Sequence, residues 1–175
     1  MKETIMFGLF FFCFQLACAQ YDVFEIARKG TVTELEEILR ECPEKINAVN
    51  EAGYDLITLA TYKGNNEVAA FLIKKGANIN GKSQYGSPLM AAVVKGNTEM
   101  AKMLINAGAD LNISDSSGNT ALIYATIFKK YEIAEMLVKA SAIIDFRDIR
   151  GNSAVDYAKM TNDEKLLQLF KKEKL

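Results

Sequence analysis

The chain has 175 residues, half of them apolar and a quarter charged, with a formal net charge of −1. This length and composition suit one domain with a hydrophobic core, and they provide no basic face of the kind that binds nucleic acid. Histidine is absent, which removes the most common metal ligand and the most common general base near neutral pH. We therefore expect no cofactor, no metal and no nucleic acid partner.

Residues 1–19 differ in character from the rest of the chain. Lys2 gives a positive start, an apolar run covers Ile5–Phe14, and small residues precede Gln20. This is the three-part pattern of a secretory signal peptide, with cleavage between Ala19 and Gln20. The sequence thus predicts an exported protein, periplasmic or secreted, with a signal peptide at 1–19 and a folded domain at 20–175.

Two alternatives stay open for the leader. It can be retained as a membrane anchor, although its apolar run is shorter than the roughly 20 residues that span a bilayer. Cys18 can also be lipidated, although Leu16 lies one position too late for that pattern. Only these alternatives bring the chain to a membrane. Cleavage after Ala19 would leave Cys42 as a lone cysteine, so the favoured interpretation predicts no internal disulfide and no activated thiol.

The remaining sequence repeats itself every 32 to 33 residues. Equivalent apolar positions in successive units are Leu39, Leu72, Leu104, Leu137 and Phe170. A fixed period in this range indicates stacked units of supersecondary structure. The units fall roughly at 21–49, 50–82, 83–115, 116–148 and 149–175.

Each unit is predicted to contain two short helices. Ser87 can cap the first helix of the third unit, with Pro88 at the first helical position, where its missing N–H costs nothing. Residues able to cap recur at the same place in the other full units, namely Asp55, Thr120 and Ser153. Glycine recurs between the helices and after them, where a positive φ is needed, at Gly64, Gly76, Gly96 and Gly108.

Four segments in phase share one pattern and read DLITLA at 55–60, SPLMAA at 87–92, TALIYA at 120–125 and SAVDYA at 153–158. This pattern is similar to Thr-Pro-Leu-His-x-Ala, the core motif of the ankyrin repeat. Over roughly residues 21–175 the chain therefore resembles the ankyrin-repeat family, which implies an all-α solenoid of helix–turn–helix units with β-turn tips.

The sequence departs from the family pattern at two kinds of position. The family histidine is replaced by Thr58, Met90, Ile123 and Asp156. Lys129 replaces the glycine between the helices of the fourth unit, at a cost on the order of 1 kcal/mol if the backbone keeps its shape. We expect modest stability and a looser fourth unit.

The resemblance implies that partners bind at the turn tips and on the concave face of the first helices. The concave positions are Tyr62, Lys63, Val94, Lys95, Tyr124, Ile127, Phe128 and Tyr157. The tip positions are Tyr54, Tyr85, Asp115 and Arg150. Aromatic side chains clustered on one surface favour a binding patch, and the alternative is that several of them pack between neighbouring units.

The favoured function is an exported, monomeric module that binds another protein as an adaptor, inhibitor or protective partner. A membrane-tethered scaffold with an uncleaved leader is the second hypothesis. The third hypothesis is an enzyme with an unrecognised site. Against it, the sequence shows no nucleophile paired with a base, no phosphate-binding loop and no clustered acids. Glu67, Glu99 and Glu132 recur with the repeat and are structural by default.

Overall fold

The computed structural model describes residues 18, 21–83 and 86–172, and these hold ten α-helices and one 3₁₀ helix without a named strand. The first unit contains α2 (Val23–Lys29), α3 (Val32–Glu41) and the 3₁₀ helix η1 (Pro43–Asn47). The other four units contain α4 (Leu56–Lys63) and α5 (Asn66–Lys74), α6 (Pro88–Lys95) and α7 (Thr98–Asn106), α8 (Ala121–Ile127) and α9 (Tyr131–Lys139), and α10 (Ala154–Met160) and α11 (Glu164–Lys172).

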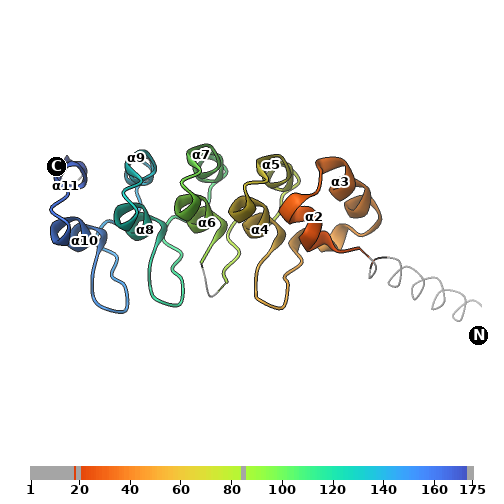
Figure 1. Cartoon of the computed structure of the whole chain (residues 1–175), viewed down its shortest axis with the longest axis horizontal. Helices are drawn as coiled ribbons and strands as arrows, with labels where there is room; N and C mark the ends of the chain where they lie inside the picture. Colours follow the sequence, from red (N-terminus) through yellow and green to blue (C-terminus); the bar gives the residue numbers. More distant parts are fainter. Residues whose placement is uncertain (1–17, 19–20, 84–85, 173–175) are drawn as a thin grey trace, which may run out of the picture.

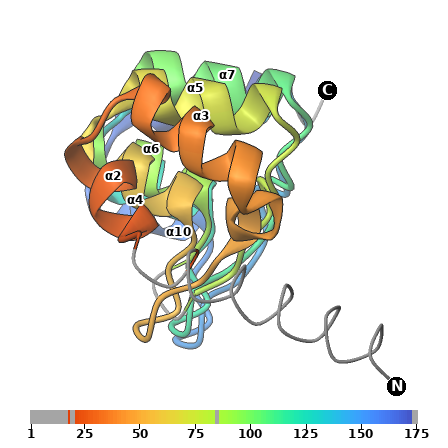
Figure 2. The same cartoon turned by 90° about the vertical axis from the view of Figure 1, so that its right-hand side faces the viewer.

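The units stack side by side and confirm the predicted all-α solenoid (Figure 1). One row contains the inner helices α2, α4, α6, α8 and α10, and the other contains the outer helices α3, α5, α7, α9 and α11. The loops before α4, α8 and α10 project as tips on the side away from the outer helices (Figures 1 and 2). None of the helices in the described part of the chain is long and apolar enough to cross a membrane.

Polar caps begin the inner helices, as the sequence predicts. The Asp55 carboxylate accepts the Thr58 N–H at 2.7 Å, and Ser87 caps α6 with Pro88 in the first turn. Thr120 and Ser153 accept the equivalent N–H groups in α8 and α10. Each cap satisfies one of the amide groups that a helix start leaves without a partner.

The junction between inner and outer helix differs along the stack. Gly64 and Gly96 end α4 and α6 in the left-handed region, with φ of 78° and 66°. Lys129 and Asn162 adopt the same conformation in units 4 and 5, with φ of 52° and 50°. The predicted strain at Lys129 is thus present, because a side chain in this region clashes with its own backbone.

The core lies between the two rows of helices and continues from unit to unit. Leu72, Leu104 and Leu137 are fully buried, and Phe170 closes the series. Burying one such side chain contributes roughly 1.5 to 3 kcal/mol. In unit 1 the repeat position Leu39 is only partly buried. Fully buried alanines let the inner helices approach one another, at Ala60, Ala92, Ala125 and Ala158.

Asparagine side chains fix each unit to the next beyond the core. The carboxamide oxygen of an asparagine after an outer helix accepts a backbone N–H about one repeat further along the chain. These pairs are Asn47 with Asn78 at 2.8 Å, Asn80 with Asp110 at 2.8 Å, and Asn112 with Ile143 at 2.9 Å. The spacing of the repeat is therefore held by directional bonds as well as by apolar packing.

A disulfide joins Cys18 to Cys42, with a Cα–Cα distance of 6.0 Å. Both cysteines are buried, and the Lys45 ammonium donates hydrogen bonds to the carbonyl oxygens of Cys18 and Tyr21. The prediction of an unpaired Cys42 is therefore wrong for the chain that retains Cys18, because the end of unit 1 brings the two sulfur atoms together. The proposed cleavage residues, Ala19 and Gln20, lie outside the described residues.

Candidate protein-binding surface

Exposed apolar side chains occupy the last turn of four successive inner helices. They are Tyr62, Val94, Ile127 with its neighbour Phe128, and Met160, between 37% and 63% exposed. Because each residue sits at the same place in its unit, the side chains form one row across the stack. We call the exposed side chains of the inner helices and tips the inner surface. Isolated exposed apolar residues are ordinary, whereas a contiguous set indicates a contact surface.

Lysines accompany this row in units 2 and 3. Lys63 and Lys95 are exposed at the ends of α4 and α6, where the negative end of each helix dipole favours a cation. The Lys95 ammonium lies 4.8 Å from the centroid of the Tyr62 ring, a cation–π contact between two units. The inner surface is therefore both basic and apolar here.

Tyr124 and Tyr157 are only partly exposed, because their hydroxyl groups are engaged. Each donates to an aspartate nine residues earlier in the chain, Asp115 or Asp148, at 2.5 Å. Burial and the bond to Asp115 raise the pKa of Tyr124 to about 12. The Phe128 ring stacks on Tyr124 with centroids 5.6 Å apart. The predicted aromatic set thus divides into exposed rings and rings that brace the fold.

The same aspartates close their tips. Asp115 is 8% exposed, and its carboxylate accepts the backbone N–H groups of Ser117 and Asn119. Asp148 accepts those of Arg150 and Asn152 in the same way. Asp115, predicted as a contact residue, therefore holds its tip in shape. The nine-residue spacing from Asp to Tyr recurs in the sequence and is the signal for this brace, which the prediction of contact residues missed.

The other predicted tip residues have different surroundings. Tyr54 is partly buried, and its N–H donates to the Asn50 side chain at 3.0 Å. Arg150 is exposed at the tip of unit 5. Tyr85 lies outside the described residues.

A groove of about 310 Å³ lies between units 4 and 5 on the inner surface. It is lined by Ser117, Asn119, Ile127, Asp148, Ile149, Arg150, Tyr157 and Thr161. The groove brings together three of the predicted residues, Ile127, Arg150 and Tyr157. The predicted positions in units 2 and 3 do not line it.

The two tips that flank the groove are fixed to each other. The Ile149 N–H donates to the Ser117 carbonyl oxygen at 3.1 Å. Gly118 lies so close to the next tip that a β-carbon there would be 2.9 Å from the Asp148 Cα. The groove is therefore formed before any partner arrives.

Comparison with known families decides the identity of the repeat. A family model described as ankyrin repeats, in three copies, matches residues 23–115 and again 60–148. The chain belongs to the ankyrin-repeat family. Ankyrin repeats commonly bind other proteins and typically act as scaffolds without catalysis. No curated protein matches the chain.

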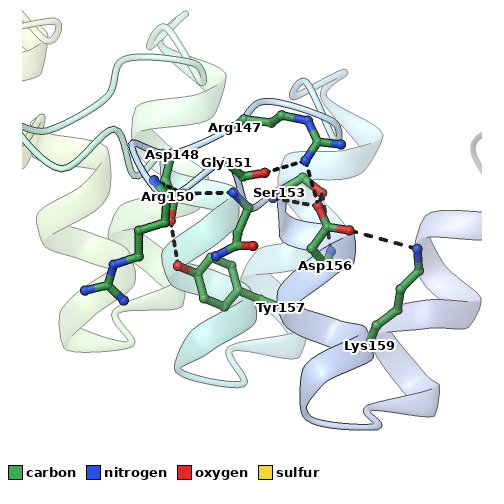
Figure 3. Close-up of polar contacts among 9 residues, drawn as sticks. Arg147, Asp148, Arg150, Gly151, Ser153, Asp156, Tyr157 and Lys159 are labelled. Atoms are coloured by element: carbon green, nitrogen blue, oxygen red, sulfur yellow. Dashed lines mark hydrogen bonds and ion pairs between the residues drawn. The ribbon is translucent and has the colours of Figure 1, made fainter.

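In unit 5 a carboxylate stands at the position of the ankyrin histidine. Asp156 accepts hydrogen bonds from the Ser153 N–H and hydroxyl at 3.0 and 2.8 Å, and Arg147 donates to it at 3.1 Å (Figure 3). The Ser153 bonds are the main reason that the pKa of Asp156 lies below its usual value. The loop contacts of the missing histidine are thus changed here rather than lost.

Groups that could bind a metal gather at one place among the described residues, namely Cys18, Cys42 and Glu44. The disulfide occupies both sulfur atoms, and the thiolate is the form of cysteine that binds metals. The cluster is therefore part of the first unit's structure.

Proposed function

We propose that this ankyrin-repeat protein is an exported binding module that holds another protein on its inner surface, as an adaptor, inhibitor or protective partner. The observation that carries the proposal is the row of exposed apolar side chains across the inner helices, with its largest group at Ile127 and Phe128. Large apolar side chains held on a rigid scaffold supply binding energy at low entropic cost.

Two features support export. Residues 1–19 have the pattern of a secretory leader. The pairing of Cys18 with Cys42 suits an oxidising compartment, where disulfides form and persist. The compartment is periplasmic or extracellular in this proposal.

The disulfide also favours a second candidate, a scaffold tethered to the membrane by its uncleaved leader. Cleavage after Ala19 removes Cys18 from the chain, so a protein that has lost its leader cannot keep the bond unless the leader stays attached through it. In a tethered scaffold the bond would hold the domain close to the retained segment.

An enzymatic role has weaker support. The inner-surface carboxylates of Asp115 and Asp148 are used by hydrogen bonds within the tips, and histidine is absent. Among the described residues that line the groove between units 4 and 5, no nucleophile is paired with a base. We therefore assign binding rather than turnover to this surface.

The binding proposal is tested by affinity capture from the native host with tagged protein. We expect the double variant Ile127→Glu, Phe128→Glu to lose a partner that the wild-type protein retains, because two apolar side chains that the partner would cover become charges without partners. Ile143→Glu is the matched control, since Ile143 is 51% exposed and lies outside the inner helices and tips. Equal recovery of the partner by the double variant and the control would exclude the inner surface.

The intact mass of the exported protein separates the two candidates. A cleaved module begins at Gln20 under reducing and non-reducing conditions alike. A tethered scaffold retains the mass of residues 1–19 even after reduction, and it remains with the membrane until detergent is added. A mass that falls only on reduction would identify a cleaved leader held by the Cys18–Cys42 bond.

A further inference from the structure

The two arginines of the tip before α10, Arg147 and Arg150, have different roles. Arg147 is used within the fold, because its guanidinium donates to Asp156 and to the Gly151 carbonyl oxygen. Arg150 is exposed. In the described part of the chain its guanidinium donates no hydrogen bond and forms no close ion pair, although its charge is one of the causes that lower the pKa of Asp148. In Figure 3 the Arg150 side chain leaves the tip on the side of Tyr157, while Arg147 turns toward Asp156.

Among the residues described, the lining of the groove between units 4 and 5 holds one cation, Arg150, and one carboxylate, that of Asp148. Asp148 is 7% exposed, and its carboxylate accepts three hydrogen bonds, from the Tyr157 hydroxyl and the N–H groups of Arg150 and Asn152. These donors offset its charge locally. The charge that a partner meets is therefore the Arg150 guanidinium.

Apolar side chains lie beside that guanidinium. Ile149 is 75% exposed and Ile127 is 39% exposed, and the Tyr157 ring completes this side of the groove. The inner helices α4, α6 and α8 contain no carboxylate, and they add the cations Lys63 and Lys95. A partner segment that runs along the inner surface thus meets apolar groups and positive charge together.

We propose that the groove binds an acidic segment of the partner protein, in which a side-chain carboxylate pairs with Arg150 and a neighbouring aliphatic side chain packs on Ile127, Ile149 and Tyr157. The inference rests on the binding function proposed above and names the chemistry of the partner. An arginine fork matches a carboxylate in geometry as well as in charge. Since the tips are already joined at Ser117 and Ile149, little ordering is required on binding.

The test selects random peptides displayed on phage against the immobilised full-length protein. We expect the selected peptides to be net acidic with aliphatic residues between the acids. A synthetic copy of a selected peptide, followed by fluorescence anisotropy, should bind Arg150→Glu about tenfold or more weakly, because attraction becomes repulsion. Arg150→Gln should give an intermediate loss, and added salt should weaken binding to the wild-type protein.

Lys102→Glu is the matched control, because Lys102 is exposed on the outer helix α7 and the variant makes the same change of charge. It should bind the peptide as the wild-type protein does. Arg150→Glu should lower the melting temperature only slightly, since the exposed guanidinium donates no hydrogen bond and its interaction with Asp148 is one between charges near the surface. Selected peptides without an acidic excess, or unchanged binding by Arg150→Glu, would overturn the proposal. If the Ile127→Glu, Phe128→Glu variant still loses its partner in that case, the binding function stands and only the acidic groove is rejected.

Discussion

Units 2 and 3 have glycine at the junction between their two helices, whereas units 4 and 5 have Lys129 and Asn162 there. The first pair uses glycine at its left-handed positions. Among the described residues, three residues other than glycine have a positive φ, and all of them lie in units 4 and 5, namely Lys129, Ser141 and Asn162. The second pair also contains the braced tips, the groove and the most exposed apolar residues of the inner surface. Departures from a locally consistent sequence tend to mark functional surfaces, and here they surround the groove.

The largest effect should come from breaking the contact between the tips of units 4 and 5. Gly118→Ala places a β-carbon 2.9 Å from the Asp148 Cα at a φ of 78°, so it should cost the left-handed penalty of about 1 kcal/mol and an overpacking term of about 1 to 3 kcal/mol. Gly151 also has a positive φ, and a β-carbon there would have no neighbouring atom within 4 Å. Gly151→Ala should therefore show the left-handed penalty alone. Urea unfolding followed by circular dichroism compares them, and equal losses would mean that the tips can move apart.

Restoring the pattern at the unit 4 junction should stabilise the protein. Lys129→Gly removes a side chain from a left-handed position and should gain about 1 kcal/mol. Gly64→Ala, with a φ of 78° and free space around it, should lose a similar amount in unit 2. A thermal melt of each variant gives the sign, and a destabilised Lys129→Gly would indicate that the 4.0 Å contact between Lys129 and Asp163 matters more than backbone strain.

The start of α9 gives an independent test of the difference between units 3 and 4. Lys130 provides no side-chain cap, whereas Asn97 accepts the Met100 N–H at 3.1 Å at the start of α7. Lys130→Asn should therefore gain about 1 kcal/mol. Asn97→Lys should lose at least as much, because it removes the cap and also the hydrogen bond that the Asn97 amide donates to the Asn66 side chain at 2.7 Å. Urea midpoints of the two variants should move in opposite directions, and a shift of both in one direction would contradict the capping argument.

The two-helix units could be predicted from the sequence because caps, glycines and apolar spacing are local signals. Ser87 and Gly96 perform the roles that their types imply. The sequence could not show which aromatic residues are exposed and which brace a tip. Tyr124 and Phe128 are neighbours on one helix turn, and only the position of Asp115 decides that Tyr124 forms the hydrogen bond. The Cys18–Cys42 bond was missed because the leader pattern placed Cys18 outside the folded domain.

At one buried position a hydrogen bond is missing in unit 2 and present in unit 4. The Thr61 hydroxyl is buried with no hydrogen-bond partner, while the equivalent Thr126 donates to the Leu122 carbonyl oxygen at 2.9 Å, and unit 3 has Val93. Thr61→Val should stabilise the protein by about 1 kcal/mol, because a buried hydroxyl without a partner is costly. Thr126→Val should show no such gain. Equal gains in calorimetric melts would mean that the Thr61 hydroxyl has a partner after all.

The smallest effect is expected from acid. The pKa of Asp156 is lowered mainly by the hydrogen bonds from the Ser153 N–H and hydroxyl. Its carboxylate therefore stabilises the folded state at pH values above the ordinary aspartate pKa near 3.9. That stabilisation is lost as the pH falls through the lower pKa of the folded state. Asp156→Asn should therefore reduce the difference in melting temperature between neutral and strongly acidic buffer. An unchanged difference would assign the acid sensitivity to other carboxylates.

The asparagine bonds between successive units also bear on how such a chain can change in length. Each one reaches only the adjoining unit, from Asn47 to Asn78, from Asn80 to Asp110, and from Asn112 to Ile143. Since contacts in a solenoid are made only between neighbours, duplicating or deleting one whole unit between Asn47 and Asn112 would leave every remaining asparagine opposite a suitable N–H. Gene duplication could thus lengthen the stack without redesigning either end, while the pair of units that forms the groove is inherited intact.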